Sequence, residues 1–472
     1  MEEKKVNIIH YVIVFALCFL FRFLPPFGQV TPYGMGILGT FIGAIYGWST
    51  IGMAWTTLMC LVGIGLSVGA NQMIAACFNM TIVGMIFIMF IVYKLNSTGA
   101  TNWLVNSILG SKMTKGKPWL TLAMLFAACY MGGVLNSMIM AIVFVGIYTN
   151  LFRSLGVPAY SKLITCTLVG SALAIMMGQI GIPVMGNALM LIAIYNAMVP
   201  VPLDFVAYML FMIPMGIAVI LFYIVLMKFV FRVDVTPLKE YDPSLIGGGL
   251  QPATKDQKLA IFFFVLFMVL AVCSSIAVLG PVYAFLGKFG LFGFAAVCIC
   301  LMMLVKGEDG KPFLDFRAGG ASVGWDAVLM VGYIMVISTY MNTPETGISQ
   351  TLMGLLTPFT SLNPLVFVVV ALFIGMLLTN IATNLIIVAM FMPVLFNFAG
   401  LVGLSPTMLI LLLFMFSHFA LATPAAAPPT GIFYTATDIV KPGDLTKTAL
   451  ITLPLIFAFA LIIGIPYASI LF

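Results

Sequence analysis

The amino-acid sequence is poor in charge. Only 7% of its 472 residues are Asp, Glu, Lys or Arg, whereas soluble domains carry about 25%. Hydrophobic residues make up 63% of the chain. So few charges cannot cover a surface that faces water, and most of the exterior must therefore face lipid. Apolar stretches of about 18 residues or more follow one another along almost the whole chain. We therefore predict an all-α, multi-pass protein of the cell (inner) membrane, with about 11 spans.

The residues that an embedded enzyme needs are also missing. The chain has two histidines, and it contains neither Gly-x-Ser-x-Gly nor His-Glu-x-x-His. Its eight cysteines are scattered through apolar segments without a Cys-x-x-Cys motif, so we interpret them as buried small side chains and expect no metal site. The sequence contains no visible ring of charges of the kind that forms a channel filter. It also has no basic face that could bind nucleic acid. We therefore expect a membrane protein that is not an enzyme.

One polar linker of any size interrupts the apolar runs. It extends from Val233 to Gln257 and contains a Gly247-Gly248-Gly249 run that is typical of flexible coil. Basic residues at both ends of the linker favour a cytoplasmic position. The linker divides the chain into a first half, residues 1–232, and a second half, residues 258–472.

The two halves contain similar features in the same order, which predicts an internal two-fold repeat. Each half has two apolar runs around a polar turn, at Asn96–Gly99 and at Asn342–Gly347. We predict a re-entrant helical hairpin in each, at about residues 80–111 and 325–356. We expect the repeat to be inverted and its scaffold and transport parts to be interleaved, although the parity of spans around the first hairpin stays open.

After each predicted hairpin comes a proline that can begin a helix, Pro118 and Pro364. Polar residues then interrupt an apolar helix, at Asn136-Ser137 and at Thr379–Asn384. Each half next has a segment broken by Gly and Pro. Asn136 and Pro183 are 47 residues apart (183 − 136), and Asn380 and Pro428 are 48 residues apart (428 − 380).

Such interruptions have a functional meaning inside a membrane. Every backbone N–H and C=O in hydrocarbon needs a partner, so a helix that breaks there must line a cavity or hold a ligand. The free N–H groups of a broken helix can bind an anion, and the free carbonyls at its other end can bind a small cation. The sequence therefore predicts a binding site for a small solute between the two halves, and alternating access around it.

These motifs resemble those of the divalent anion:sodium symporters, within a wider superfamily of ion transporters. Asn136-Ser137 and Thr379-Asn380-Ile381-Ala382-Thr383 are similar to the paired Ser-Asn-Thr motifs of that family. The tract Ala422–Thr430 is similar to its Thr-Pro-Pro-Asn stretch, and Gly186-Asn187 to the first-half counterpart.

The resemblance implies a homodimeric elevator-type carrier of a di- or tricarboxylate or sulfate, driven by Na⁺ and without another cofactor. By this resemblance the substrate would be bound by Asn136, Ser137, Thr379, Asn380, Thr383 and Thr430. The coupled cation would be bound by Asn136, Gly186, Asn187, Asn380 and Pro428.

The sequence also departs from the family pattern. Leu135 and Ile381 stand where the motifs have hydroxyl side chains, and Thr430 stands where the second tract has Asn. We therefore expect a weaker dependence on sodium than in typical relatives, and an exchanger, a proton-coupled carrier or a less charged substrate stays open. His418 lies in an apolar run, where it either takes part in proton coupling or forms a helix–helix hydrogen bond. The main alternative function is an exporter of oxyanions or organic solutes from the same superfamily.

Overall fold

The computed structural model describes residues 7–109, 115–183, 186–199, 203–240, 252–274, 276, 279–341, 343–358, 363–381 and 383–472. These residues form helices and short connections. Among them the only β-type pairing is an isolated bridge between Lys306 and Pro312. The predicted all-α architecture is confirmed. The Gly247–Gly249 run of the linker lies outside the described residues, as do Asn342 and Ala382.

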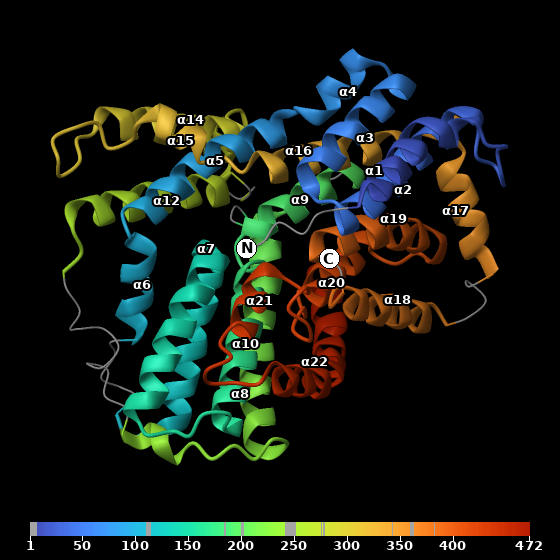
Figure 1. The fold of residues 1–472 in the computed structure, drawn as a ribbon. Helices are drawn as coiled ribbons and strands as arrows, with labels where there is room; N and C mark the ends of the chain where they lie inside the picture. The colour runs from blue at the N-terminus through green and yellow to red at the C-terminus, as the bar shows by residue number, and fades with distance from the viewer. Residues whose placement is uncertain are drawn as a thin grey trace.

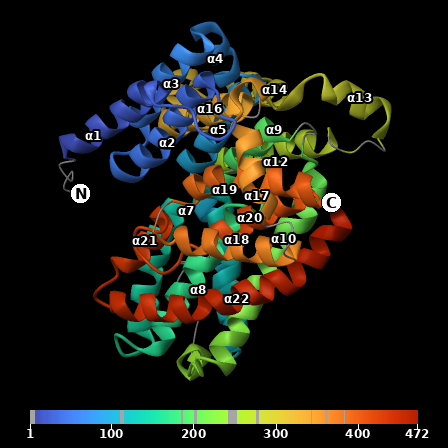
Figure 2. The same ribbon diagram turned by 90° about the vertical axis from the view of Figure 1, so that its right-hand side faces the viewer.

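The helices form two layers, which can be followed in Figures 1 and 2. The upper layer contains α1 (Ile8–Phe15), α2 (Pro32–Thr50), α3 (Met53–Val68), α4 (Ala70–Cys77), α5 (Met80–Ser97), α12 (Lys255–Cys273), α13 (Pro281–Gly287), α14 (Gly290–Leu304), α15 (Phe316–Ala321) and α16 (Trp325–Met341). The lower layer contains α6 (Ala100–Leu109), α7 (Pro118–Ser154), α8 (Lys162–Gly178), α10 (Phe205–Phe229), α18 (Pro364–Leu378), α20 (Pro406–Ser417), α21 (Pro428–Tyr434) and α22 (Pro442–Leu471). The two layers meet at α9 (Gly186–Met198) and α19 (Asn384–Val402), and α17 (Ile348–Leu356) runs down from the upper layer.

Many of these helices suit a bilayer. Six of the described helices are long and apolar enough to cross a membrane, namely α5, α7, α10, α12, α19 and α22. The pair α13 and α14 is bent by 82° and passes the same test together, and several shorter helices are also apolar. The chain is therefore a multi-pass membrane protein. The expected total of about 11 spans stays a prediction.

The helix α7 is a hairpin that reverses at Asn136. A straight helix of its 37 residues would be about 55 Å long, well beyond the bilayer thickness of about 30 Å. Asn136 has non-helical backbone angles, φ −160° and ψ 90°. The Cys129 sulfur lies 3.3 Å from the Tyr148 hydroxyl, although residues so far apart in a straight helix would be separated by about 28 Å. The two arms of α7 therefore pack side by side in opposite directions.

The second half has an equivalent hairpin made of α18 and α19. The rings of Phe367 and Phe398, one near the open end of each arm, have centroids 4.0 Å apart. The reversal lies at Thr379–Thr383, between the two helices. Both hairpins begin with the predicted proline, Pro118 or Pro364, in the first helical turn.

The hairpins therefore lie later in the sequence than predicted. The segments 80–111 and 325–356 do form a helix, a turn and a second helix within their described residues, as α5–α6 and as α16–α17. Their arms diverge, however, because α5 packs mainly against α14 while α6 runs beside α7. In the second half α17 packs against α19. The Asn-containing motifs consequently lie at hairpin tips, and not inside broken spans.

The same order of elements recurs in both halves. A hairpin is followed by a buried helix, a break and a further helix: α7, α8 and α9 in the first half, and α18–α19, α20 and α21 in the second. From Leu163 to Gly178 in α8 and from Met408 to Ser417 in α20, every residue is buried. A helix buried on all sides lies at the centre of its layer. The predicted breaks around Pro183 and Pro428 are present.

Glycines let the first hairpin approach α8 closely. A Cβ atom on Gly133 would overlap the Ile175 carbonyl oxygen, and a Cβ atom on Gly178 would overlap the Tyr130 carbonyl oxygen. Both obstacles are backbone atoms, which cannot rotate away. Gly146, in the other arm of α7, is exposed, and a Cβ atom added there would have no neighbour within 4 Å.

We expect Gly133→Ala to lower the melting temperature in detergent, because the hairpin and α8 would have to separate. Overpacking of this kind costs about 1–3 kcal/mol. Gly146→Ala is the matched control within the same helix. It should leave the melting temperature unchanged or raise it, since Ala favours a helix over Gly by roughly 1 kcal/mol. Equal melting temperatures for both variants would contradict the close contact.

Candidate functional site

The tip of the second hairpin is bound to the loop that follows α20. The Asn380 side-chain oxygen accepts hydrogen bonds from the backbone N–H groups of Leu421 (2.8 Å) and Ala422 (2.7 Å). Its amide nitrogen donates to the carbonyls of Met376 (2.8 Å) and Phe419 (3.0 Å). One buried side chain thus satisfies three backbone groups that follow the end of α20 and one carbonyl of the preceding helix, α18.

Two predicted substrate ligands have the same structural task. The Thr379 hydroxyl donates to the Ser417 carbonyl, and the Thr430 hydroxyl donates to the Ala420 carbonyl, each over 2.7 Å. Both carbonyls belong to the broken end of the α20 segment, where no helical N–H group remains to pair with them. Thr379, Asn380 and Thr430 are therefore brought together around one helix break.

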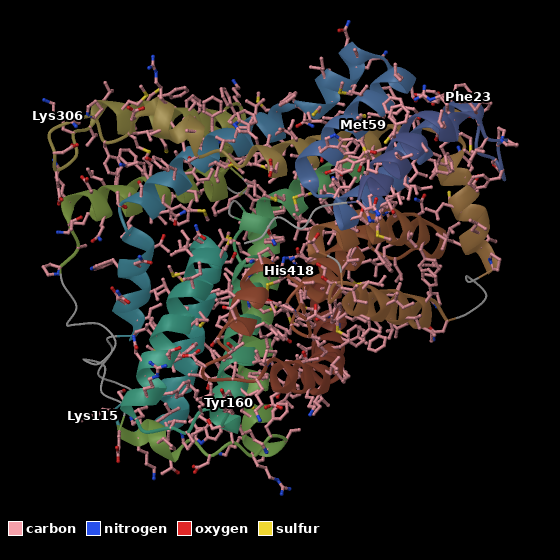
Figure 3. The ribbon with its side chains drawn as sticks, in the orientation of Figure 1. Phe23, Met59, Lys115, Tyr160, Lys306 and His418 are labelled. Carbon is pink, nitrogen blue, oxygen red and sulfur yellow. The ribbon has the colours of Figure 1, made fainter. Side chains whose placement is uncertain are left out.

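His418 joins this break to the first half of the chain. The ring lies near the centre of the molecule, and it is fully buried (Figure 3). Its Nε2 atom accepts from the Asn384 amide at 2.9 Å and faces the Asn187 amide at 3.3 Å. Its Nδ1 atom lies 2.8 Å from the Phe414 carbonyl. This arrangement suits a neutral imidazole that donates from Nδ1 and accepts at Nε2. The structure thus shows a hydrogen bond between helices at His418, and its role in proton coupling stays a prediction.

The break in the first half is closed by Gln179. Its side-chain oxygen accepts from the Asn187 amide at 2.7 Å, and its carbonyl accepts from the Ala188 N–H at 3.1 Å. The Tyr208 hydroxyl donates to the carbonyl of Ile180 over 2.6 Å. Gly186 is the first residue of α9, as Pro428 is of α21. The backbone groups of the second break are therefore met largely by side chains, and those of the first break by both side-chain and backbone partners.

The first hairpin tip is tied down less firmly than the second. The Asn136 side-chain oxygen accepts from the Ile139 N–H at 3.1 Å, which caps the returning arm of its own hairpin. Within the described parts of the chain, no hydrogen bond joins Asn136 or Ser137 to the second-half residues. The described hydrogen bonds thus connect Thr379, Asn380, Thr430, Asn187 and His418 around the second break, and none of them includes the first tip, although α7 and α21 pack together.

The departures from the family motifs differ in environment. Leu135 is buried at the base of the first tip, while Ile381 is 73% exposed at the second tip. Met138 and Ile139 on the first tip are 53% and 44% exposed. Both tips therefore expose apolar side chains beside their amides.

Two buried hydroxyls lack a partner near the breaks. The Thr383 and Tyr130 hydroxyl oxygens are inaccessible to solvent and make no hydrogen bond with the described residues. Such groups are rare in native proteins, because an unmade hydrogen bond costs about 1–3 kcal/mol. Tyr130 lies against Gly181 in the first break, and Thr383 ends the second tip. Each is a place where a ligand or an ion can supply the missing partner.

Sequence reasoning missed Asn384, Gln179 and Tyr130. Asn384 directly follows the motif residue Thr383, and Gln179 lies in the first Gly/Pro-rich break. A polar residue at the edge of each motif was the available signal. Tyr130 gave none, because a tyrosine in an apolar helix is ordinary.

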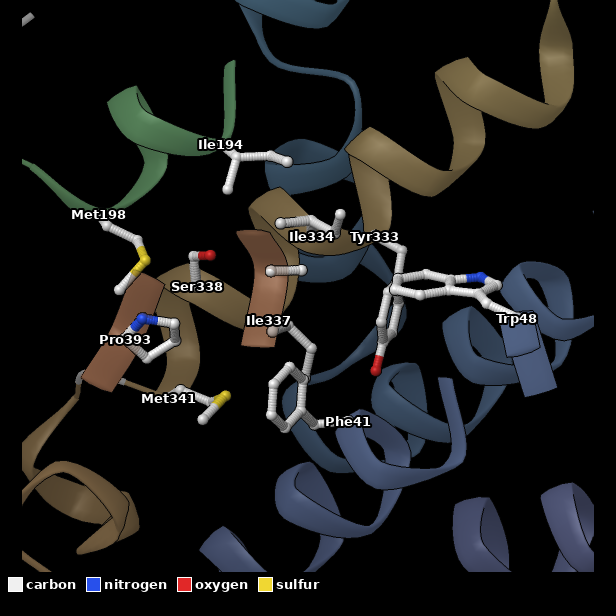
Figure 4. A pocket seen from close by; sticks show the side chains of 11 residues that line it. Phe41, Trp48, Ile194, Met198, Tyr333, Ile334, Ile337, Ser338, Met341 and Pro393 are labelled. Atoms are coloured by element: carbon white, nitrogen blue, oxygen red, sulfur yellow. The ribbon is translucent and has the colours of Figure 1, made fainter. Parts of the chain in front are cut away.

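A small cavity lies at the seam between the two layers (Figure 4). It is lined by residues of α2, α9, α16 and α19, and its volume is about 10 Å³. Its polar lining is limited to Ser338 and the indole and phenol groups of Trp48 and Tyr333, which pack edge to face with ring centroids 5.8 Å apart. The cavity is too small for a substrate, and it marks an apolar contact between the layers.

The two motif asparagines should differ in their effect on stability. Asn380→Ala removes four hydrogen bonds and leaves buried backbone groups unpaired, at about 1–3 kcal/mol each. Asn136→Ala removes one cap of about 1 kcal/mol. We expect the melting temperature in detergent to fall much further for Asn380→Ala, with Asn380→Asp intermediate because it keeps the acceptor. Equal losses would contradict the bracing role of Asn380.

No protein-family model matches the chain. Among curated proteins, it is 26% identical over 148 residues to the sodium-dependent high-affinity dicarboxylate transporter 3 of Caenorhabditis elegans, covering 31% of this chain and 26% of that protein. It is 25% identical over 149 residues to the Na⁺/citrate cotransporter of Mus musculus, covering 30% and 26%. Solute carrier family 13 member 1 of Homo sapiens is 24% identical over 140 residues, covering 29% and 23%. The match thus spans about a quarter of each of these relatives.

Among solved structures, the chain resembles MtrF of Neisseria gonorrhoeae, which represents a class of antimetabolite efflux pumps. The TM-score is 0.56 at 16% sequence identity, covering 87% of this chain and 84% of MtrF. This likeness shows a shared fold. The comparisons agree with the resemblance found in the motifs. Over about 30% of its length the chain is homologous to sodium-coupled dicarboxylate and citrate cotransporters, and it has the fold of a membrane transporter.

Proposed function

We propose that the chain is a secondary active transporter for a small anion, and not an enzyme. The observation that supports this most is the meeting of the two halves at His418, where Asn187 beside the first break and Asn384 beside the second tip share one ring nitrogen. Interrupted helices at membrane depth are tolerated where protein covers them or a cavity lies beside them, and in transporters they mark substrate sites. Relatives that carry dicarboxylates and citrate favour a di- or tricarboxylate as the substrate.

The chemistry of the core favours coupling to a cation. The buried polar residues that the structure describes are Thr, Ser, Asn, Gln and His, without Lys or Arg. A carboxylate moved into this core would meet N–H groups and hydroxyls but no fixed positive charge, and an unpaired charge is expensive to bury. A Na⁺ or H⁺ that travels with the anion removes much of that penalty. We assign the substrate to Asn136, Ser137, Thr379, Asn380, Thr383 and Thr430.

The coupled cation has a natural place at the helix breaks, where carbonyl oxygens are free of helical partners. Asn136, Gly186 and Asn187 serve this role in the first half, and Asn380 and Pro428 serve it in the second. The second-half carbonyls already accept hydrogen bonds from Thr379, Asn380 and Thr430. With Leu135 and Ile381 in the motifs, we expect weak sodium dependence.

We further propose an elevator-type movement of the lower layer against a homodimeric upper layer in the inner membrane. The seam at α2, α9, α16 and α19 supports this, because an apolar contact with few hydrogen bonds can slide without leaving buried polar groups unpaired. The interleaving of the two layers along the sequence agrees with scaffold and transport parts built from both halves.

An exporter of organic solutes is the second candidate. Exposed Met138, Ile139 and Ile381 at the tips favour a substrate with an apolar part. The fold of an efflux pump, MtrF, agrees with this alternative. Export would be favoured if expression of the protein made cells resistant to a toxic organic solute while the purified protein took up no carboxylate.

Transport is tested by uptake of labelled succinate and citrate into proteoliposomes with a sodium gradient, a proton gradient or neither. We expect uptake above protein-free liposomes, stimulated by one of the two gradients. Thr383→Val should reduce the uptake rate roughly tenfold, because it removes one hydrogen bond to a charged group. Its melting temperature should not change, since the hydroxyl has no partner among the described residues.

Thr56→Val is the matched control for that experiment. The Thr56 hydroxyl is also buried, with no partner in the described part of the chain, but it lies in α3 of the upper layer. This variant should transport at the wild-type rate. If Thr383→Val does so as well, the second hairpin tip does not contact the substrate.

The elevator movement predicts that locking the seam stops transport. Ser338 of α16 and Ala389 of α19 line the same small cavity, so cysteines at both positions are within reach of a bridging mercuric ion. We expect the ion to abolish uptake by the double variant and a thiol reductant to restore it. The two single-cysteine variants control for the native cysteines. Full activity of the bridged protein would rule out movement at this seam.

A further inference from the structure

A second cavity, lined in part by charged side chains, lies at one end of the upper layer, away from His418. It has a volume of about 530 Å³ and opens between the last turn of α5, the first turn of α12, the end of α14 and the loop 305–315. Figure 3 shows Lys306, in this loop, at the corner of the molecule. Because α5 and α12 are candidate spans, the cavity lies where membrane helices end.

The floor of this cavity is preformed. The loop 305–315 is pinned by three backbone hydrogen bonds, from Phe313 to Val305 (2.7 Å), from Leu314 to Met302 (3.1 Å) and from Gly307 to Lys311 (2.9 Å). Phe313 and Leu314 are buried beneath it. A cavity held in this way can bind a ligand without first ordering its walls.

Three carboxylates around the cavity already have backbone partners. One oxygen of Asp256 accepts from the Glu308 N–H at 3.0 Å, and one oxygen of Asp309 accepts from the Lys311 N–H at 3.0 Å. Asp315 caps α15 by accepting from the Arg317 N–H at 2.8 Å. The second oxygen of each carboxylate is left for another donor.

The three cations of the cavity have no such partners. Among the described residues, no carboxylate lies within salt-bridge distance of Lys94, Lys311 or Arg317. Lys94 is half-buried, and its Nζ atom lies 4.3 Å from the centre of the Phe313 ring. No hydrogen-bond acceptor in the described part of the chain meets that ammonium. A half-buried cation that faces a cavity and has neither a salt-bridge partner nor a hydrogen-bond acceptor is positioned to bind an anion.

An apolar stripe leads to the cavity along α14. Val297, Leu301 and Leu304 lie four and three residues apart, on one face of the helix, and are 42%, 40% and 78% exposed. The neighbouring residue Met303 lines the cavity itself. In a membrane protein such a stripe contacts acyl chains, so the polar cavity and the lipid-facing surface are continuous.

We propose that this cavity binds the zwitterionic headgroup of a glycerophospholipid. The phosphate lies against Lys94, with Lys311 and Arg317 around it, the ammonium lies toward Asp256 and Asp309, and the acyl chains follow α14. Equal numbers of cations and carboxylates favour a zwitterion over an anionic headgroup. No group of three metal-ligating side chains is found among the described residues, so the carboxylates do not form a divalent-cation site.

The test is native mass spectrometry of the delipidated full-length protein with phosphatidylethanolamine, phosphatidylglycerol, diacylglycerol or glycerophosphoethanolamine. We expect one tightly retained phosphatidylethanolamine and weaker retention of the other three. Lys94→Met keeps the aliphatic stem and should weaken that binding roughly tenfold, as the loss of one charge-assisted hydrogen bond does. Asp309→Asn should weaken the binding of phosphatidylethanolamine and not that of phosphatidylglycerol.

Lys258→Met removes a charge from the same end of α12 outside the cavity and should bind as the wild type does. Equal retention of phosphatidylethanolamine by Lys94→Met and the wild type would overturn the proposal. Diacylglycerol retained as well as the phospholipid would do so too. If glycerophosphoethanolamine without acyl chains binds equally well, the ligand is a soluble phosphate compound and the lipid assignment is wrong.

Discussion

A helix that stops inside a bilayer leaves backbone groups that water cannot reach, and this constraint governs the centre of the molecule. Around the break after α20, side chains meet that need: Asn380 pairs with four backbone groups, and Thr379 and Thr430 each pair with a carbonyl. Without these partners the unmade hydrogen bonds would cost about 1–3 kcal/mol each. The second-half motif residues therefore stabilise the helix break, and their proposed role in binding the substrate comes in addition to this structural role.

The same constraint separates bracing residues from residues that are free for a ligand. A side chain whose hydrogen-bonding capacity is used by the backbone, such as Asn380, has to exchange one of these hydrogen bonds in order to contact a substrate. The Thr383 and Tyr130 hydroxyls are buried and have no partner among the described residues, and the Asn136 side-chain oxygen caps a helix. The two halves repeat the same elements but share these tasks unequally. The second tip is hydrogen-bonded to the break after α20. No hydrogen bond among the described residues joins the first tip to that break.

The elements of the fold could be predicted from the sequence better than their pairing. Pro118 and Pro364 correctly marked helix starts, and Pro183 and Pro428 correctly marked breaks. The sequence predicts hairpin turns at Asn96–Gly99 and near Gly347, because glycine and asparagine are typical of turns. Turns are present there, but whether two helices then pack together is decided by neighbours such as α14 and α7. The reversal at Asn136-Ser137 has no Pro or Gly of its own, so the sequence predicts an interruption of the helix there but not that the chain turns back.

A core without fixed charge also suits the movement that we propose. A buried Arg would pair well with a carboxylate, but it would have to cross the low-dielectric region unpaired whenever the carrier returned empty, at a cost of several kcal/mol or more. Amides, hydroxyls and the neutral ring of His418 can pair with each other when no substrate is bound, as Asn187, Asn384 and Gln179 do here. In the proposed cycle most of these groups stay paired in the empty site, and the charge that balances the substrate arrives and leaves with it. This agrees with the positions of the described charged side chains, most of which lie at helix ends and loops, while the described centre is polar and neutral.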